Sequence, residues 1–335
     1  MSFSKIRKIF LVGIATVFFI LCISYATGES DQPDEDSAPV VCIAWRANTE
    51  SETYKSVLLA IERAGGQALP LPQIESKDIS YEGSGKIRSK CLTDSGMLKK
   101  EYAKKVRDGG VKRSNAEEVI RANAVRAVIF TGGNDISPSL YETPDIERNN
   151  GEPFDPEGDV SDFLLMSCCL ERDIPVLGIG RGMNMMAIIA GAEMIQDLPA
   201  YYLKKGIAYG ETHRMSDDGM QDFATHGVQL VPGDSLFRSI IQTDVMKRVP
   251  SWHHQAVVKT KTSRFTVTGQ APTQGTNIIE AIEIPGKRFA LGLQFNPEIV
   301  ISGNPKGWKK HFSDYDTTLR IFQAIVNIAR PPRDI

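Results

Sequence analysis

The stretch "PVLGIGRGMNMMAIIAGA", residues 175–192, decides the fold. The apolar run from Pro175 to Ile179 has the length and composition of a buried strand, and a helical pattern follows the sharp Gly-Arg-Gly turn. A strand, a sharp turn and a helix in this order predict a nucleophile elbow, which raises one side chain to the top of a sheet. The residue at the apex is Gly180, which has no side chain to raise.

The segments before the elbow predict an α/β domain. "VVCIAW" (40–45) reads as a buried strand, residues 53–64 have apolar positions at helical spacing and run into Gly65-Gly66, and "ALPLP" (68–72) reads as a second strand. "AVRAVIFTGG" (124–133) contains a further strand over 127–130. A strand, a helix and a strand in succession predict a mostly parallel sheet.

The segments after position 155 are predicted to complete the domain. Residues 159–172 read as a helix before the elbow, and residues 313–329 read as a closing helix. Four alternating segments read as strands, partly in hairpins, added to the edge of the sheet: "HGVQLV" (226–231), "FTVTGQA" (265–271), "IIEAIEI" (278–284) and "FALGLQF" (289–295).

The N-terminus predicts export. Basic residues at positions 5, 7 and 8 precede an apolar run over 9–23 and the small residues Ser24 and Ala26, so residues 1–26 read as a signal peptide. An uncleaved anchor is the alternative, because the apolar run approaches the ~18–20 residues of a spanning helix. Residues 27–39 are acidic and are expected to form a disordered tether. The domain, residues 40–330, is therefore expected outside the cytoplasm, either periplasmic or secreted.

Composition argues for a packed core and against a nucleic-acid partner. Hydrophobic residues make up 41% of the chain, charged residues 24%, and the net charge is −2. Residues 74–124 interrupt the α/β pattern, and between Lys86 and Arg113 there are ten Lys or Arg residues against three acidic ones. This segment reads as a solvated surface insertion or as a basic contact for a protein or cell-envelope partner. No oligomeric state is predicted.

The cysteines indicate no redox or metal chemistry. Cys42, Cys91, Cys168 and Cys169 remain after the leader, and they read as structural thiols, with a bridge through Cys91 left open. Their spacing fits no zinc pattern, and neither a cofactor nor a metal ligand is predicted.

Four separated blocks resemble one family. They are "TGGNDISPSLY" (131–141), "PVLGIGRGMNMMAIIAGAEMIQDLP" (175–199), "SWHHQAV" (251–257) and "LGLQFNPE" (291–298). They are similar to the oxyanion loop, the elbow, the His-His-Gln segment and the closing Gln-Phe-His-Pro-Glu motif of class I glutamine amidotransferase-like hydrolases. The nearest branch is the gamma-glutamyl hydrolase group, which includes gamma-glutamyl-gamma-aminobutyrate hydrolase. The resemblance implies a three-layer α/β/α, flavodoxin-like fold and cysteine-dependent hydrolysis.

The departures from that family concern the catalytic residues. The family's nucleophile position is Gly180 here, its general-base position is Asn296, and only the third member, Glu298, remains. Such a cycle needs a nucleophile and a base that takes its proton, and losing one member removes several orders of magnitude in rate. The sequence therefore predicts a pseudoenzyme that keeps a pocket for a gamma-glutamyl or amino-acid-like ligand, or an extracytoplasmic interaction module. The alternative is a residual hydrolase with His253 or His254 as its base.

The pocket predicted from the resemblance has two parts. The first is an oxyanion site built from Gly132, Gly133 and Asn134 and from the backbone N–H of Arg181, although a Gly-Gly pair alone reads more simply as a turn. The second contains residues with two possible roles each, a ligand contact or a structural one: Asp135 as a turn cap, and His253, His254 and Gln255 as internal hydrogen-bonding groups.

Overall fold

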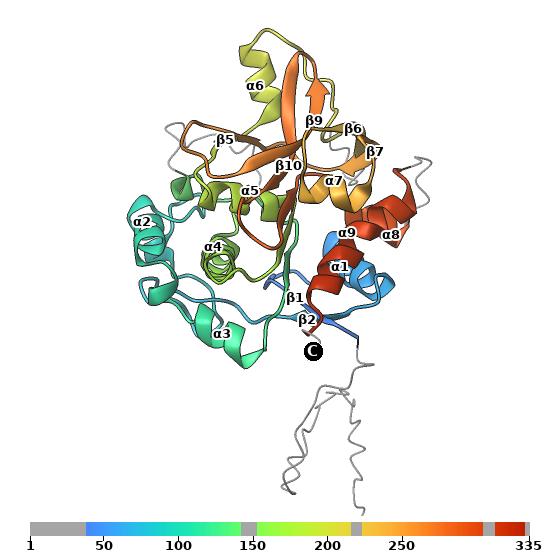
Figure 1. Cartoon of the computed structure of the whole chain (residues 1–335). Coiled ribbons are helices and arrows are strands. Elements are labelled where there is room, and N and C mark those ends of the chain that lie inside the picture. Colours follow the sequence, from blue (N-terminus) through green and yellow to red (C-terminus); the bar gives the residue numbers. More distant parts are fainter. Residues whose placement is uncertain (1–37, 142–152, 216–222, 304–311, 332–335) are drawn as a thin grey trace, which may run out of the picture. The chain divides into compact units, whose positions relative to one another are not determined.

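The computed structural model describes residues 38–141, 153–215, 223–303 and 312–331 (Figure 1). The predicted signal peptide and nearly all of the predicted tether lie outside the described residues. The centre of the domain is a nine-stranded sheet with the strand order β2-β1-β3-β4-β11-β10-β9-β6-β7. A two-stranded antiparallel sheet, β5 (Glu193–Ile195) and β8 (Ala256–Val258), lies beside it.

One half of the main sheet is parallel, as predicted from the strand–helix–strand pattern. Its strands are β2 (Gln67–Pro70), β1 (Val40–Ile43), β3 (Val128–Phe130), β4 (Val176–Ile179) and β11 (Ala290–Leu293). The residues of β3, β4 and β11 are all buried, which suits their continuous apolar sequences.

The other half is antiparallel and contains the predicted hairpins. Its strands are β10 (Thr276–Glu283), β9 (Thr266–Thr273), β6 (Ala224–Leu230) and β7 (Val245–Ser251). One prediction differs: the last segment, expected near the edge with the others, forms β11 between β4 and β10. Its central position brings residues 294–298 to the end of the elbow strand.

Helices cover both faces of the sheet and give the three-layer α/β/α fold (Figure 1). One face carries α2 (Lys100–Gly109), α3 (Ala116–Ala122), α4 (Pro156–Glu171) and α5 (Arg181–Ile189). The other carries α1 (Glu52–Arg63), α7 (Leu236–Ile241), α8 (Pro297–Ser302) and α9 (Tyr315–Ile328). A short helix, α6 (Leu198–Lys204), follows β5. No helix among the described residues is long and apolar enough to cross a membrane.

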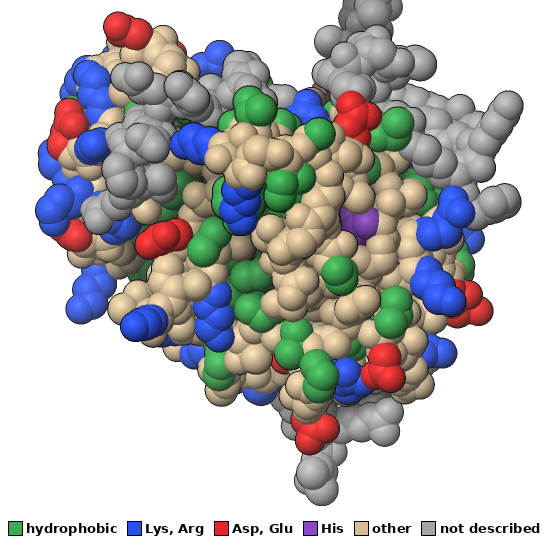
Figure 2. All heavy atoms as spheres, turned by 90° about the horizontal axis from the view of Figure 1, so that it is seen from above, with side chains coloured by type: hydrophobic (Ala, Val, Ile, Leu, Met, Phe, Trp, Pro, Cys, Tyr) green, Lys and Arg blue, Asp and Glu red, His purple; other side chains and the backbone are tan. Residues whose placement is uncertain are grey.

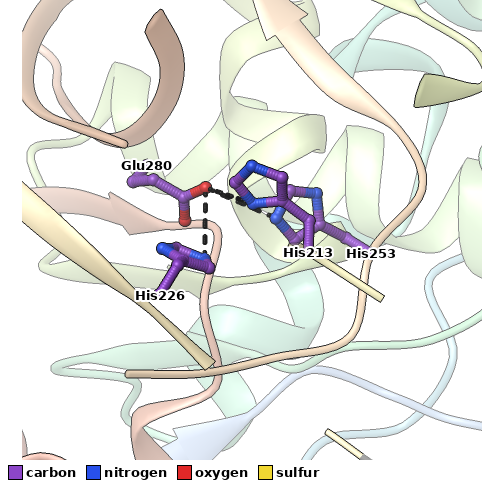
Figure 3. Close-up of side chains that lie close together, drawn as sticks. All are labelled: His213, His226, His253 and Glu280. Carbon is purple, nitrogen blue, oxygen red and sulfur yellow. Dashed lines mark ion pairs between the residues drawn. The ribbon is translucent and has the colours of Figure 1, made fainter. Parts of the chain in front are cut away.

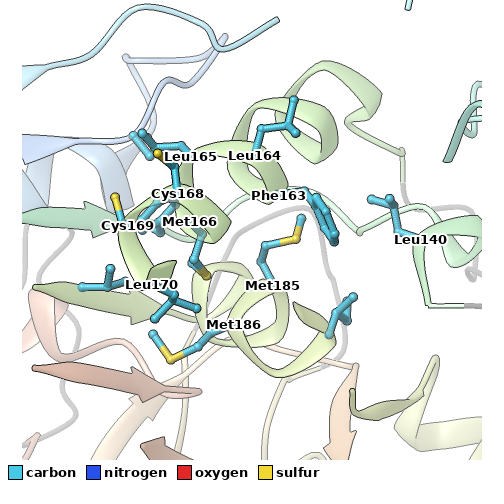
Figure 4. Close-up of a cluster of buried hydrophobic side chains, with 14 of the residues drawn as sticks. Leu140, Phe163, Leu164, Leu165, Met166, Cys168, Cys169, Leu170, Met185 and Met186 are labelled. Atoms are coloured by element: carbon cyan, nitrogen blue, oxygen red, sulfur yellow. The ribbon is translucent and has the colours of Figure 1, made fainter. Parts of the chain in front are cut away.

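The core consists of two hydrophobic clusters, one on each face. Alternate residues of a strand point to opposite faces, so Val128 and Phe130 join one cluster while Ile129 joins the other. Figure 4 shows part of the first cluster, where Phe163 of α4 and Met185 of α5 are drawn. These two layers hold the elbow strand rigidly from both sides.

The basic segment 74–124 is the crossover between β2 and β3. It contains α2, α3 and two 3₁₀ turns, η1 (Ser89–Cys91) and η2 (Val111–Arg113). Ile74, Leu98 and Ala103 are fully buried in the first cluster. The expectation of a solvated insertion is therefore corrected: the charged residues face outward, but the apolar residues between them belong to the core.

The cysteines are buried free thiols, in agreement with the structural reading. Among the described residues, Cys91 forms no bridge of the kind that the sequence left open. Burial raises the pKa of Cys42 to about 11 and that of Cys169 well above its usual value, so these thiols stay protonated. Neither can replace a nucleophile missing from the elbow.

Candidate functional site at the elbow

The predicted elbow is present, and Gly180 is its apex. This residue joins β4 to α5 with φ 54° and ψ −111°, and its N–H donates to the carbonyl of Leu293 at 2.7 Å. Positive φ is strained for residues that carry a side chain and nearly free for glycine. A Cβ on Gly180 would meet only Gly132 Cα at 3.7 Å and the Gln294 carbonyl oxygen at 3.9 Å, which are ordinary contacts. The apex therefore has room for a side chain that it does not carry.

The two flanking glycines have a different role, which is close packing. A Cβ on Gly178 would lie 2.6 Å from the carbonyl oxygen of Gly182, and a Cβ on Gly182 would lie 2.3 Å from the carbonyl oxygen of Phe130. Both distances are far inside van der Waals contact. Helix α5 can therefore approach β3 and β4 this closely only because both positions are glycine.

A cavity of about 350 Å³ opens at the elbow. It lies beyond the carboxyl ends of β1, β3, β4 and β11, where open α/β sheets commonly bind ligands. All but one of the predicted site residues line this cavity. They are Gly132, Gly133, Asn134, Asp135, Gly180, Arg181, His253, His254, Gln255 and Asn296. The exception is Glu298, which is fully buried beside Asn296.

Asn296 and Glu298 keep the contact that a base and its orienting carboxylate would make. Asn296 precedes α8, its N–H donates to the carbonyl of Pro250 at 2.8 Å, and its side-chain Nδ2 donates to Glu298 Oε1 at 2.9 Å. An amide nitrogen cannot take up a proton at neutral pH. The contact between the two side chains is present, but Asn296 cannot serve in it as a proton acceptor.

Burial raises the pKa of Glu298 to about 7, although the hydrogen bond from Asn296 opposes this. The folded protein therefore binds the Glu298 proton more tightly than the unfolded chain, where the pKa is near 4.5. This contribution to stability is complete below about pH 4.5 and is lost as the pH rises through 7.

We expect Glu298→Gln to remove this pH dependence. The unmodified protein should lose about 3 kcal/mol of unfolding free energy between pH 4.5 and pH 8 from this group, and the neutral amide should not. Urea unfolding of both proteins across this pH range measures the difference. Parallel stability profiles for the two proteins would contradict the assignment of a proton-binding Glu298.

A buried network of charged side chains lies under the cavity. The sequence motifs did not predict it. Arg181 Nη2 donates to Asp159 Oδ1 at 2.7 Å, and its Nη1 donates to Asp162 Oδ2. Arg46 Nη1 donates to Asp162 Oδ1 at 2.8 Å. These side chains are at most 5% exposed. Burial alone would lower the pKa of Arg181, but the two carboxylates hold it above its usual value, so Arg181 stays charged.

This network fixes the predicted oxyanion loop. Arg46 Nη2 donates to the carbonyl of Thr131 at 2.7 Å, and its Nε donates to the carbonyl of Gly132 at 3.2 Å. The side chain of Arg181 thus points into the network, while its backbone opens α5, whose leading N–H groups have no partner within the helix. The sequence does contain one indication of this network. Asp159 and Asp162 interrupt the apolar helix α4, and buried carboxylates require cationic partners.

His254 is held between two carboxylates. Its Nε2 lies 3.0 Å from Asp135 Oδ1, and its Nδ1 lies 3.2 Å from Asp197 Oδ1. Burial lowers its pKa, but the two carboxylates outweigh burial and raise the pKa to about 9. His254 is therefore an imidazolium at neutral pH. Among the described residues, the side chain of Asp135 contacts His254 through one oxygen and accepts from no turn N–H.

His253 is hydrogen-bonded through one of its two ring nitrogens. Its Nδ1 lies 2.7 Å from the carbonyl oxygen of Gln255, and its Nε2 lies 3.4 Å from Glu280 Oε1 on β10. Both histidines therefore line the cavity, but the nitrogen atoms of both rings are directed at protein groups. The structural role that the sequence left as an alternative is the one the contacts support.

Known proteins with similar sequences were identified by comparison. A sequence profile described as Peptidase C26 matches residues 110–298. Protein NtpR of Enterococcus hirae is 31% identical over 182 residues, which cover 53% of this chain and 68% of that protein. Gamma-glutamyl-gamma-aminobutyrate hydrolase of Escherichia coli O157:H7 is 28% identical over 167 residues, 49% of this chain and 60% of that protein.

Among solved structures, the glutaminase domain of Trypanosoma brucei CTPS with bound acivicin aligns with 87% of this chain and 94% of that one, at a TM-score of 0.46 and 15% identity.

The elbow, the loop after β3 and the closing Asn-Pro-Glu segment all lie within residues 110–298, the range that the Peptidase C26 profile matches. From the profile match and the sequence relatives, this chain belongs to the Peptidase C26 family of class I glutamine amidotransferase-like proteins.

Proposed function

We propose that the protein is a catalytically inactive member of its family that binds a gamma-glutamyl or amino-acid-like ligand in the elbow cavity. One observation carries the proposal: the loop predicted as the oxyanion site, the elbow and several polar side chains line one cavity, while the apex is Gly180 and the position predicted for the base is Asn296. A scaffold that had lost both chemistry and binding would have no need of a polar cavity.

The walls of the cavity carry buried polar atoms that the protein itself does not pair. Asp135 Oδ2, Asn184 Oδ1 and both polar atoms of the Gln294 amide have no hydrogen-bond partner among the described residues. Each unpaired buried group costs about 1–3 kcal/mol. A ligand with an amide and an ammonium group would pair them, which supports an amino-acid-like ligand.

Charge supports the same ligand class. Asp135 presents a carboxylate oxygen to the cavity, and Arg214 lines the cavity with its guanidinium 4.7 Å from the centre of the Trp252 ring. We propose that the ammonium of the ligand binds Asp135 and that its carboxylate is attracted by Arg214. A zwitterionic head group satisfies both charges at once.

The alternative of a residual hydrolase has less support. His254 is charged at neutral pH and donates both of its protons, so it cannot act as a base. His253 directs one ring nitrogen at a carbonyl and the other at Glu280. His254 has no lone pair that could take up a proton, and the lone pair of His253 Nε2 is directed at Glu280.

Calorimetry with gamma-glutamyl-gamma-aminobutyrate and with glutamine tests the binding proposal. We expect measurable heat from at least one of them, and about 10- to 100-fold weaker binding by Asp135→Asn, because a charged hydrogen bond contributes about 1.5–3 kcal/mol. Asp197→Asn is the matched control, since Asp197 also contacts His254 but does not line the cavity.

Three outcomes would contradict parts of the proposal. Absence of heat with both compounds would exclude the ligand, and release of glutamate during the same incubation would exclude inactivity. Equal losses in Asp135→Asn and Asp197→Asn would show that the effect passes through His254 and not through a contact with the ligand.

The location outside the cytoplasm and the partner contact through Lys86–Arg113 stay predictions from the sequence. On the face shown in Figure 2, Lys and Arg side chains are interspersed with Asp and Glu. Within the segment, Arg113 pairs with Asp78, and Lys104 pairs with Asp108. Because Leu98 and Ala103 are in the core, a test of this contact must reverse exposed charges such as Lys86 and Lys100 and not delete the segment.

A further inference from the structure

Three of the five histidines of the chain meet one glutamate beside the cavity (Figure 3). His213 lies in the loop after α6, His226 in β6, His253 after β7 and Glu280 in β10. One atom of each side chain lies within 4.8 Å of the corresponding atoms of the others. All four residues are buried, and His213 and Glu280 are completely inaccessible.

The spacing of the converging atoms fits a tetrahedral ion. Glu280 Oε1 lies 3.1 Å from His213 Nδ1, 3.6 Å from His226 Nε2 and 3.4 Å from His253 Nε2. Tetrahedral Zn²⁺ with bonds of about 2.0–2.1 Å to nitrogen and oxygen separates neighbouring ligand atoms by about 3.3 Å. These three distances bracket this value. The four atoms as a set span up to 4.8 Å, so the wider pairs would have to close around the ion when it binds.

The outer nitrogen of each ring is held in the way that metal-bound histidines usually are. His253 Nδ1 lies 2.7 Å from the carbonyl oxygen of Gln255, and His226 Nδ1 lies 3.3 Å from that of Gly227. A carbonyl oxygen can only accept, so each Nδ1 carries a proton and donates it. The neutral ring then presents a bare lone pair at Nε2, towards Glu280.

The His213 ring is turned the other way, with Nδ1 towards Glu280, and it also presents a lone pair to the carboxylate. Its Nε2 lies 2.9 Å from Thr273 Oγ1, and that hydroxyl donates its own proton to the carbonyl of Ala271 at 3.4 Å. His213 Nε2 therefore donates to the hydroxyl, which leaves the lone pair at Nδ1. Three nitrogen lone pairs and a carboxylate face one another, and none of these atoms has a hydrogen-bond partner among the described residues.

We propose that His213, His226, His253 and Glu280 bind one divalent transition-metal ion, with Zn²⁺ as the best match. Imidazole ligands favour Zn²⁺ and its neighbours over Mg²⁺ and Ca²⁺. Four protein ligands in a buried cluster leave no open coordination position, which is typical of structural zinc sites and not of catalytic ones. This proposal replaces the sequence prediction that the chain has no metal ligand.

Such an ion would hold one wall of the cavity in place. Arg214 and His254, which line the cavity, are each next in sequence to a ligand, His213 and His253 respectively. The ion would tie these two loops to strands β6 and β10 of the main sheet. Its role would be to fix the wall without contacting the bound ligand.

The full chain, purified without added chelator, tests the proposal by elemental analysis. We expect about one zinc ion per chain. After chelation and dialysis, added Zn²⁺ should raise the melting temperature by roughly 10 °C at saturation. Co²⁺ added in its place should give the intense visible absorption of a tetrahedral nitrogen–oxygen site, which a surface-bound ion would not give.

Variants then locate the ion. Glu280→Gln and His226→Gln should lose the zinc and its effect on the melting temperature, while His254→Gln, a neighbour of His253 that is not a ligand, should keep both. If the ligand variants fail to fold, the Zn²⁺ and Co²⁺ titrations of the unmodified chain decide alone. A chain that holds no zinc and responds to neither ion would overturn the proposal, and so would zinc retained by a folded His226→Gln.

Discussion

Gly180→Cys combined with Asn296→His is expected to give the protein gamma-glutamyl hydrolysis at least ~10³-fold above that of the unmodified chain. A Cβ at the apex would make only ordinary van der Waals contacts, because its nearest neighbours lie 3.7 Å and 3.9 Å away. A histidine at position 296 would stand where the Asn296 side chain already donates to Glu298. The start of α5 would favour the thiolate through its dipole. Release of glutamate from gamma-glutamyl-gamma-aminobutyrate measures the gain.

The single variants are the controls for this experiment. Gly180→Cys alone has no base and Asn296→His alone has no nucleophile, so each should stay near the background rate. Gly180→Ala with Asn296→His carries the same backbone strain without a thiol and should also be inactive. Because all three lack one chemical role, equal activity in any of them would show that hydrolysis does not pass through the introduced thiol and imidazole acting together. A stable but inactive double variant would show that the oxyanion site has been lost as well.

Asp162→Ala is expected to cost about 3–5 kcal/mol of unfolding free energy, the largest loss of stability predicted for this chain. Asp162 is the shared partner of Arg46 and Arg181, and its side chain is completely buried. Without it, Arg181 keeps Asp159 as a carboxylate partner, while Arg46 keeps only backbone carbonyls among the described residues. Arg46 also holds the carbonyls of Thr131 and Gly132, so ligand binding should weaken along with stability. Urea unfolding and calorimetry on the same sample measure both effects.

A second Asp–Arg pair in the chain is the matched control. Arg288 Nε lies 3.0 Å from Asp173 Oδ2, and these side chains are 61% and 38% exposed. Because water solvates both groups after the pair is broken, Asp173→Ala should cost less than about 1 kcal/mol. Similar losses in the two variants would mean that burial does not set the energy of the network. In that case the rigidity of the oxyanion loop would need another cause.

The parallel half of the fold could be predicted from the sequence, because short continuous apolar runs such as 176–179 and 128–130 are typical of the buried strands of a parallel sheet. The elbow was predictable because Gly178, Gly180 and Gly182 satisfy backbone demands that other residues meet poorly. The position of β11 was not, since strand order depends on pairing between segments far apart in the chain. The apolar residues of 74–124 were hidden among lysines and arginines, so their burial was missed.

Most of the cavity-lining residues were predictable because the family motifs bring them together in order. The contacts beneath the cavity were not predicted. Arg46 pairs with Asp162 across 116 positions, and neither belongs to a motif. The four candidate metal ligands lie on four separate segments, so no local spacing reveals them. Groups that act through long-range contacts leave only a weak trace in the sequence, such as a carboxylate inside an apolar helix.

The positive φ of Gly180 also bears on how the proposed inactivity could be reversed by substitution. A first change to cysteine would place a side chain in a backbone conformation that costs of order 1–3 kcal/mol, and it would bring no activity while position 296 is asparagine. A first change to histidine at 296 would bring none either. Every single-step path back therefore passes through a variant that is no more active, and one of the two paths passes through a less stable protein. Gly180 keeps the backbone of the elbow unstrained, so replacing it first would cost stability and would not restore hydrolysis.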